Sequence, residues 1–288
     1  MHKAQDVMGR LNLTDKRLSK GHLKIADFIS VHYGKATHMT AGDLAKGAGV
    51  SESTVVRFAM ALGYEGYPQL QKALQEVVRH RLTAAQRLEL SSEMPKTQVL
   101  ETVLKGDIQN IRATIEEMDM QAFENAVERI LAAKNIYVMG LRSAAPLAQF
   151  FGYYLNYLFD NVRRVSSGTA DVFEEIARIS KEDVLIGISF PRYSTRTLEA
   201  MRFARKAGAQ VIAITDGVLS PLKKAADVCL EAQTELASFV DSLAAPLSVI
   251  NALIVAMAIR RKEELANHFK QLEGIWDAHS VYLLEDEA

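Results

Sequence analysis

A cluster of hydroxyl and guanidinium side chains lies in one short segment of the sequence. The segment Ser189-Phe-Pro-Arg-Tyr-Ser-Thr-Arg-Thr197 contains four serine and threonine hydroxyls and two arginines. Proteins use such donors to hold a tetrahedral oxyanion. A second segment, Gly140-Leu-Arg-Ser143, offers a hydroxyl, a cation and the backbone N–H groups of a helix start. Both segments are therefore predicted to bind an anion.

Both segments follow stretches that have the composition of buried strands. The runs Val184–Ile188 and Val211–Ile214 are continuously apolar, as strands covered by helices on both faces are. Similar runs alternate with helical segments, and we expect strands at residues 136–139, 162–165, 184–189, 211–215 and 228–230. This alternation predicts an α/β fold with a doubly wound parallel sheet. Ligands of such sheets bind beyond the carboxyl ends of the strands, where both segments fall.

Helix capping is the alternative explanation for either segment, because serine and threonine often begin helices. Two hydroxyl-rich turns on one sheet favour an anion site over two separate caps. The sequence contains neither Gly-x-Gly-x-x-Gly nor Gly-x-x-x-x-Gly-Lys, which argues against a dinucleotide or a P-loop nucleotide. We therefore expect a small phosphorylated ligand, and neither a cofactor nor a metal ion.

The N-terminal part of the chain has a helical pattern, and residues 40–62 are its most informative segment. Thr40 with Asp43 has the pattern of a capped helix start, and Gly49 permits the backbone of a tight turn. Ser51 is then expected to cap a second helix. The inward face of that second helix is predicted from apolar residues at spacings of three and four, namely Val55, Phe58 and Leu62.

The outward side of this second helix has the side chains of a DNA-reading surface. Ser53, Thr54 and Arg57 stay outside the apolar stripe, and Ser51 precedes them at the helix start. Arginine pairs with guanine in the major groove, and short hydroxyls reach phosphates or base edges. The segment therefore predicts a helix-turn-helix, although a small helical bundle without DNA would also satisfy two capped helices.

Charge is divided unevenly along the chain, although the net charge is only -1. Residues 1–80 carry 11 Lys and Arg against 7 Asp and Glu, and the remaining residues carry 23 against 28. A basic N-terminal part joined to an acidic remainder is consistent with contact to nucleic acid at one end only.

The helix-turn-helix segment resembles the N-terminal domain of RpiR-type regulators. The resemblance is carried by Leu44-Ala45, Gly49-Val50-Ser51, Thr54-Val55-Val56-Arg57-Phe58 and Leu62-Gly63-Tyr64-Glu65-Gly66-Tyr67-Pro68. The run through Gly63, Gly66 and Pro68 is particularly typical of that family. The resemblance implies DNA binding, with Gln69 and Lys72 after the recognition helix in contact with the phosphate backbone.

Residues 122–261 resemble the SIS, or sugar isomerase, domain that RpiR-type regulators carry after the helix-turn-helix. This resemblance implies recognition of a phosphosugar, and the hydroxyls that hold its phosphate would be those of Ser143, Ser189, Ser194 and Thr197. The sequence departs from the family in two ways. Thr195 stands where many members have glycine, and Phe190-Pro-Arg-Tyr193 separates two serines that the family places close together.

Arg142 and Arg192 add two cations beside the expected phosphate position. They suggest a ligand that carries a carboxylate as well, such as a phosphorylated sugar acid. The alternative is that these arginines form surface ion pairs, for which Glu199 is available. The residues expected to contact the ligand are therefore Arg142, Ser143, Ser189, Arg192, Ser194, Thr195 and Thr197.

The length and the two resemblances predict three parts: a DNA-binding domain at residues 1–80, a linker with a connecting helix at 81–121, and a sensing domain at 122–288. The expected partners are a double-stranded DNA operator and a phosphorylated sugar effector. A homodimer or homotetramer is expected because one helix-turn-helix covers half of a palindromic site. The apolar segment 243–259, expected to be a buried helix, is one candidate interface.

Several classes of protein are disfavoured. Cys229 is the single cysteine and is expected in the core, which leaves no intramolecular disulfide. The N-terminus lacks the apolar run of a secretory signal, so a cytoplasmic protein without membrane contact is expected. A phosphosugar isomerase is the main alternative function, but its candidate acid–base residues are few and poorly placed: His268, His279, Glu174 and Glu175. A sensor is therefore predicted, rather than an enzyme or a purely architectural DNA binder.

Overall fold

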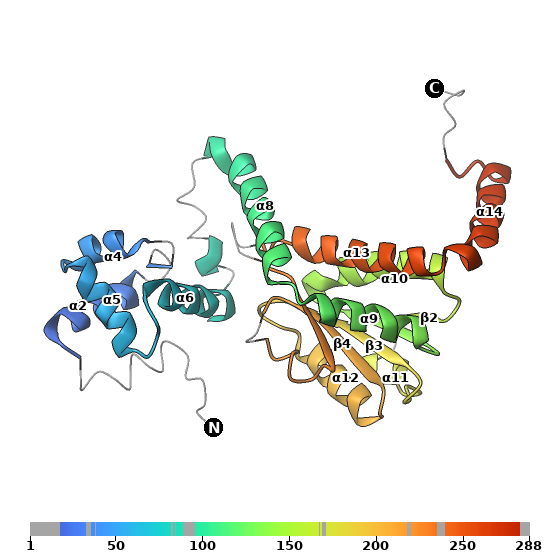
Figure 1. The fold of residues 1–288 in the computed structure, drawn as a ribbon, viewed down its shortest axis with the longest axis horizontal. Coiled ribbons are helices and arrows are strands. Elements are labelled where there is room, and N and C mark those ends of the chain that lie inside the picture. The colour runs from blue at the N-terminus through green and yellow to red at the C-terminus, as the bar shows by residue number, and fades with distance from the viewer. Residues whose placement is uncertain are drawn as a thin grey trace. The chain divides into compact units, whose positions relative to one another are not determined.

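The computed structural model describes residues 18–32, 36–37, 39–81, 83, 85–88, 96–166, 168, 171–217, 220–234 and 240–282. The chain divides into two compact units (Figure 1). The first comprises residues 1–100 with 236–240, and the second comprises residues 101–235 with 241–288.

The first unit is helical. Its longer helices are α2 (Lys20–Val31), α4 (Ala41–Ala48), α5 (Glu52–Ala61) and α6 (Tyr67–Arg81). Thr40 caps α4 by accepting the N–H of Asp43 at 3.1 Å, and Gly49 ends that helix in the left-handed conformation at φ 65°. The predicted helix-turn-helix is therefore present, and its core is built from residues of all four helices: Ile25, Ile29, Leu44, Val55, Phe58, Leu62, Leu70 and Leu74.

The predicted side-chain cap at Ser51 is wrong. Ser51 occupies the N-cap position of α5, but its hydroxyl accepts no backbone N–H. That hydroxyl instead bonds to the side chains of Ser53 at 3.0 Å and Thr54 at 2.8 Å. The neighbouring hydroxyls therefore take the place of the backbone N–H as hydrogen-bond partners of the Ser51 side chain.

The second unit contains a five-stranded sheet whose order is β2-β1-β3-β4-β5, and every neighbouring pair is parallel. The strands are β1 (Ile136–Gly140), β2 (Val162–Val165), β3 (Val184–Ile188), β4 (Gln210–Thr215) and β5 (Val228–Glu231). The predicted doubly wound sheet is confirmed, and each strand lies within a residue of its expected position.

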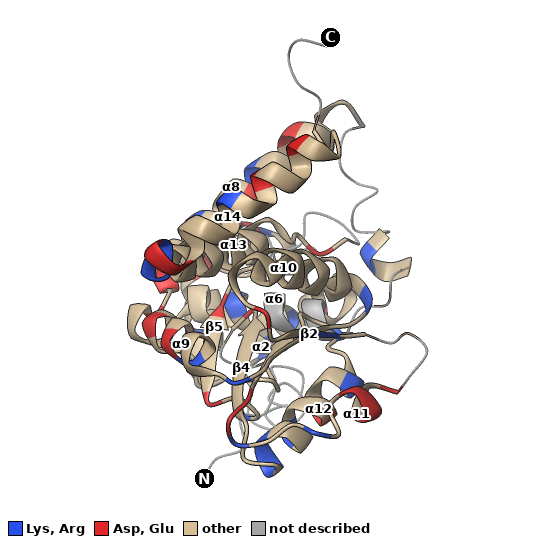
Figure 2. Ribbon diagram, turned by 90° about the vertical axis from the view of Figure 1, so that its right-hand side faces the viewer, with Lys and Arg blue, Asp and Glu red and all other residues tan. Residues whose placement is uncertain are grey.

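Helices cover both faces of this sheet, as Figure 1 shows. One face packs against α9 (Met120–Ala132), α10 (Ala145–Leu158) and α13 (Ala244–Arg260). The other packs against α11 (Val172–Glu175) and α12 (Thr195–Lys206). Alternate residues of the central strands enter the two cores, so that Ile186 faces the first and Leu185 the second. Figure 2 shows that α10 carries no charged residue, which fits its burial against the sheet.

Two expectations about burial need correction. Cys229 packs against the core of the second sheet face, but it is only partly buried because β5 is an edge strand with alternating burial. Burial still raises the pKa of the Cys229 thiol to about 12. The segment predicted as a buried helix is α13, which buries one side but leaves Val255 and Ile259 exposed.

A last helix, α14 (Lys262–Ala278), follows α13 at an angle of 103°. Among the described residues no single helix is long and apolar enough to cross a bilayer, and only this bent pair taken together meets that test of length and composition.

Candidate functional site

The two polar segments follow neighbouring strands. Gly140 at the end of β1 pairs with Ile188 at the end of β3, so the turns after these strands begin side by side. The turn after β1 leads to α10 on one face, and the turn after β3 leads to α12 on the other. This is the topological switch point of a 2-1-3-4-5 sheet, the position at which folds of this kind generally bind their ligands.

The first turn approaches the sheet so closely that only glycine fits at its start. A Cβ on Gly140 would lie 2.6 Å from the carbonyl oxygen of Ala144 and 3.0 Å from the Ala148 Cβ. Arg142 and Ser143 follow in a short 3-10 helix, and both side chains are exposed. The backbone of this turn is therefore held against the strand while its polar side chains remain available.

The second turn is fixed by hydrogen bonds among its own hydroxyls. The buried Ser189 hydroxyl accepts the N–H of Ser194 at 3.0 Å. Ser194 in turn caps α12 by accepting the N–H of Thr197 at 3.2 Å. From the end of β4, the Thr215 hydroxyl donates to the carbonyl of Ser189 at 2.8 Å. Capping, the alternative considered from sequence, is thus real for Ser194.

The inserted residues of the second turn present one exposed cation. Phe190 and Pro191 are buried, and the Tyr193 hydroxyl donates to the carboxylate of Asp216 at 2.7 Å. Arg192, between them, is exposed and has a left-handed backbone with φ 62°. Anchors on both sides therefore hold Arg192 at the outer edge of the turn.

Arg142 shares this backbone conformation, with φ 58°. Such angles are uncommon outside glycine, and they concentrate at sites where function requires strain. Within the part of the chain that the structure describes, neither Arg142 nor Arg192 forms an ion pair with Glu199 or another carboxylate. Sequence reasoning singled out both arginines but missed their backbone, for which the sequence carries no signal.

Thr197 differs from the other hydroxyls of the site. It is fully buried, and among the described residues its Oγ1 has no hydrogen-bond partner. A buried hydroxyl without a partner is unfavourable and calls for an explanation, such as a ligand oxygen that completes it. The neighbouring Thr195 and Arg196 are exposed, and Arg196 instead pairs with Asp171 at 3.6 Å.

The carboxylates and imidazoles considered for isomerase chemistry have other roles or places. Glu174 accepts the N–H of Asp171 in a capping box, and Glu175 accepts the N–H of Ser166 at 3.1 Å. His268 belongs to α14 and His279 directly follows that helix, so neither is part of the turns that follow the strands.

Helix α5, the second helix of the helix-turn-helix, presents Ser53 and Arg57 on its exposed side. Thr54 is only partly exposed, and its hydroxyl accepts from the Arg57 guanidinium at 3.4 Å. Sequence reasoning missed His22 of α2, whose ring packs edge-on against Phe58 of α5. Burial, and then the charge of Arg57, lower the pKa of His22, which keeps the ring neutral near neutral pH.

The remaining two residues expected to contact DNA lie near the start of α6. Gln69 accepts the N–H of Glu65 at 2.7 Å through its side-chain oxygen, so part of its polar capacity stabilises the preceding turn. Lys72 is exposed three residues further along the same helix.

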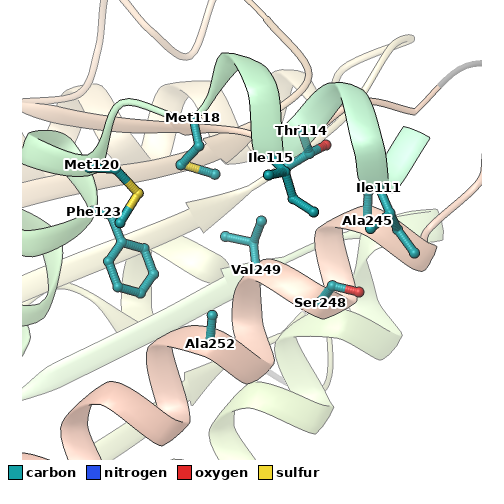
Figure 3. Close-up of a pocket in the computed structure, with 10 residues that line it drawn as sticks. All are labelled: Ile111, Thr114, Ile115, Met118, Met120, Phe123, Ala245, Ser248, Val249 and Ala252. Atoms are coloured by element: carbon teal, nitrogen blue, oxygen red, sulfur yellow. The ribbon is translucent and has the colours of Figure 1, made fainter. Parts of the chain in front are cut away.

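An apolar groove of about 360 Å³ lies elsewhere in the second unit, between α8 (Val99–Glu117), α9 and α13. Figure 3 shows its lining, in which only Thr114 and Ser248 bring a polar side-chain atom. This groove contains none of the residues expected to bind the ligand.

Models of two protein families match the chain. The helix-turn-helix domain of the rpiR family matches residues 6–80, and the SIS domain matches residues 129–256. The transcriptional regulator HexR of Pseudomonas aeruginosa is 25% identical over 281 residues, which cover 93% of each chain.

Solved structures share the fold. The sugar isomerase domain of an RpiR transcription factor from Sphaerobacter thermophilus is 29% identical, with a TM-score of 0.59, and covers 61% of this chain and 98% of its own. The Vibrio vulnificus NanR protein complexed with ManNAc-6P is 19% identical, with a TM-score of 0.55, over 94% and 98% of the two chains. With both family models matched in the expected order, the chain belongs to the rpiR-type helix-turn-helix transcriptional regulators that carry a SIS domain.

Proposed function

We propose that this DNA-binding regulator senses a phosphorylated sugar or sugar acid at the turns after β1 and β3. The observation that carries the proposal is the buried Thr197 hydroxyl, which has no partner among the described residues. It lies in the first turn of α12, after Ser189 and Ser194, and the strand that precedes this segment pairs with the strand that precedes Ser143. A phosphate oxygen would complete its hydrogen bonding.

The two strained arginines favour an effector with a second anionic group. Arg142 and Arg192 have left-handed backbones at the ends of adjacent strands, and neither has an ion-pair partner among the described residues. Arginine binds carboxylates and phosphates through two parallel hydrogen bonds. Together with the exposed Thr195, they would contact the part of the effector that lies beyond its phosphate. A phosphosugar bound to NanR, a protein of this fold, supports the class of ligand.

The DNA-binding role is assigned to residues 1–80, with residues 81–121 as the connection and residues 122–288 as the sensing domain. Ser53, Thr54 and Arg57 would enter the major groove, and Ser51 would orient the first two through its hydroxyl bonds. Gln69 and Lys72 would contact the phosphate backbone.

A homodimer or homotetramer follows from the symmetry of typical operators, because two recognition helices are needed for two half-sites. The exposed side of α13, with Val255 and Ile259, is a candidate for the contact between copies. Sedimentation velocity at micromolar concentration tests this part, and a monomeric boundary would contradict it.

The effector is tested by thermal shift and operator titration of the full-length protein with glucose 6-phosphate, ribose 5-phosphate and 6-phosphogluconate. At least one should raise the melting temperature and change operator affinity by roughly 5- to 150-fold. The double variant Ser143→Ala with Ser194→Ala should lose both effects and keep basal DNA binding. Its control is Ser30→Ala with Ser248→Ala, which removes two hydroxyls that, in the part of the chain that the structure describes, donate to carbonyls of their own helices.

The competing activity, isomerisation of the phosphosugar, is tested in the same samples. Chromatography of hexose and pentose phosphates after incubation with the protein should detect no isomer. Turnover abolished by Glu175→Gln would replace the sensor with an enzyme.

A further inference from the structure

Helix α8 is attached to the second unit in an unusual way. Of its 19 residues, the buried ones are Asn110 and Thr114, both of which are polar. Large apolar residues of the same helix stay exposed, including Leu100, Leu104 and Ile115. Helices of globular proteins normally bury an apolar stripe. The contact of α8 with the unit therefore depends to an unusual degree on directional hydrogen bonds.

Four polar residues of α8 form a stripe at spacings of three, four and three residues, which places them on one face: Asp107, Asn110, Thr114 and Glu117. We call this set the polar stripe. It binds residues at the two ends of the segment between β5 and α13, namely Gln233 and Ser242.

Gln233 is bound twice by the polar stripe. Its backbone N–H donates to the Thr114 hydroxyl at 2.9 Å, and its side-chain amide donates to the Glu117 carboxylate at 2.6 Å. The Ser242 hydroxyl donates to Asp107 at 2.6 Å. Thr114 uses its own hydrogen within the helix, in a 2.8 Å bond to the carbonyl of Asn110. Each bond pairs one donor with one acceptor, so the contact has a single well-defined geometry.

These bonds continue toward the turn after β3. The Thr215 hydroxyl donates to the carbonyl of Ser189, the first residue of that turn, at 2.8 Å. The carbonyl of Thr215 accepts the N–H of Ala232 at 2.7 Å, and the next residue is Gln233. A continuous path of hydrogen bonds and backbone therefore runs from Ser189 through the ends of β4 and β5 to Thr114 of α8.

We propose that the polar stripe is a releasable clasp that couples the strand-end site to α8. This inference rests on the proposed function, because it assigns the route by which an effector at Ser189 acts. The chain passes from the first compact unit to the second within α8. A change in how this helix packs on the second unit is therefore transmitted through the backbone to the first unit. A net hydrogen bond shifts an equilibrium only roughly 2- to 10-fold. A clasp of a few such bonds can therefore open and close, whereas a large apolar interface would not.

The test replaces the central hydroxyl of the clasp in the full-length protein. Thr114→Val keeps the shape of the side chain but removes the acceptor for Gln233, and Thr114→Ser keeps the hydroxyl. Operator affinity is measured on a duplex that the wild-type protein selects from a randomised library, with and without each phosphosugar named above. Lys105→Ala, an exposed position on the same helix, is the matched control.

Thr114→Val should change operator affinity at least 5-fold without any effector and reduce the effector response to below 2-fold, while the thermal shift by the effector persists. Thr114→Ser and Lys105→Ala should behave as wild type. If Thr114→Val does not fold, Ser242→Ala, which removes one bond at the other end of the stripe, should give a smaller change in the same direction.

Unchanged affinity and an unchanged response in folded Thr114→Val would overturn the clasp, even if the wild-type protein responds to a phosphosugar. Failure of the proposed function has a different signature. In that case no phosphosugar affects the wild-type protein, and the basal shift of Thr114→Val alone decides the clasp.

Discussion

The two candidate sites are built on opposite principles. The side chains proposed to contact DNA at α5 lie within seven residues of one another, from the N-cap Ser51 to Arg57, on the surface of one short helix. The strand-end site instead joins turns that are nearly fifty residues apart in sequence, as the pairing of Gly140 with Ile188 requires. It also contains strained backbone at two arginines and a buried hydroxyl that has no hydrogen-bond partner among the described residues.

The difference indicates in which of the two sites a substitution can change binding without changing stability. An exposed side chain on a helix supported by its own apolar stripe can change without disturbing the fold. In the strand-end site, the groups that would hold a ligand also determine how strand and helix pack. Substitutions there are expected to change stability and binding together.

The largest loss of stability is expected from Gly140→Ala, a substitution in the strand-end site. The new Cβ would lie 2.6 Å from the Ala144 carbonyl oxygen, so the turn after β1 must move, at a cost of about 1 to 3 kcal/mol in the free energy of unfolding. Urea denaturation measures this loss. Gly274→Ala is the control, since no atom lies within 4 Å of its Cβ in α14 and the change should stabilise by about 0.5 to 1 kcal/mol. Equal effects at the two glycines would contradict the close approach.

Arg57→Ala should leave unfolding unchanged within about 0.5 kcal/mol, because the side chain is exposed. Operator binding should weaken by roughly 1 to 3 kcal/mol, with the loss concentrated at one base position. Fluorescence anisotropy on a set of single-base operator variants measures the loss of affinity and its dependence on base position, and urea denaturation measures unfolding. Lys181→Ala removes an exposed charge from the other unit and should change neither operator affinity nor stability. A uniform loss across all variants would assign Arg57 to the phosphate backbone instead.

Two threonine-to-valine changes of identical chemistry test the unpartnered hydroxyl. Thr215→Val removes a hydroxyl bonded to Ser189 and Ser220 and should destabilise the protein by about 1 to 3 kcal/mol. Thr197→Val removes a hydroxyl without a partner among the described residues, so it should raise the free energy of unfolding by about 1 kcal/mol. The same variant should lose the thermal shift given by the phosphosugar. Destabilisation by Thr197→Val would show that a partner exists in solution.

The smallest expected losses of stability are those from substitutions at the two N-cap positions of the helix-turn-helix, Thr40 and Ser51. Thr40→Ala removes a side-chain cap and should cost about 1 kcal/mol, measured by urea denaturation. Ser51→Ala should cost clearly less, about 0.5 kcal/mol or below, because Ser51 accepts no backbone N–H. It should nevertheless weaken operator binding through Ser53 and Thr54, whose hydroxyls it orients. Equal losses of stability would restore Ser51 as a cap.

Local patterns in the sequence were sufficient for most of the fold. The apolar run Val184–Ile188 predicted a central strand, and Thr40, Asp43 and Gly49 predicted where α4 begins and ends. These features depend on residues only a few positions apart, so the sequence contains the whole cause. The same holds for the types of residue in both candidate sites.

Tertiary structure decided what depends on distant partners. The neighbouring positions of β1 and β3 bring Ser143 and the turn of Ser189 to one edge, and packing of the inserted Pro191 and Tyr193 places Arg192 in a left-handed backbone. Whether a hydroxyl is bonded is also decided in space: Ser51 turns to its neighbours, whereas Thr197 is buried without a partner among the described residues. Strand order, backbone strain and buried polar satisfaction arise from contacts across the sequence, and no periodicity or cap records them.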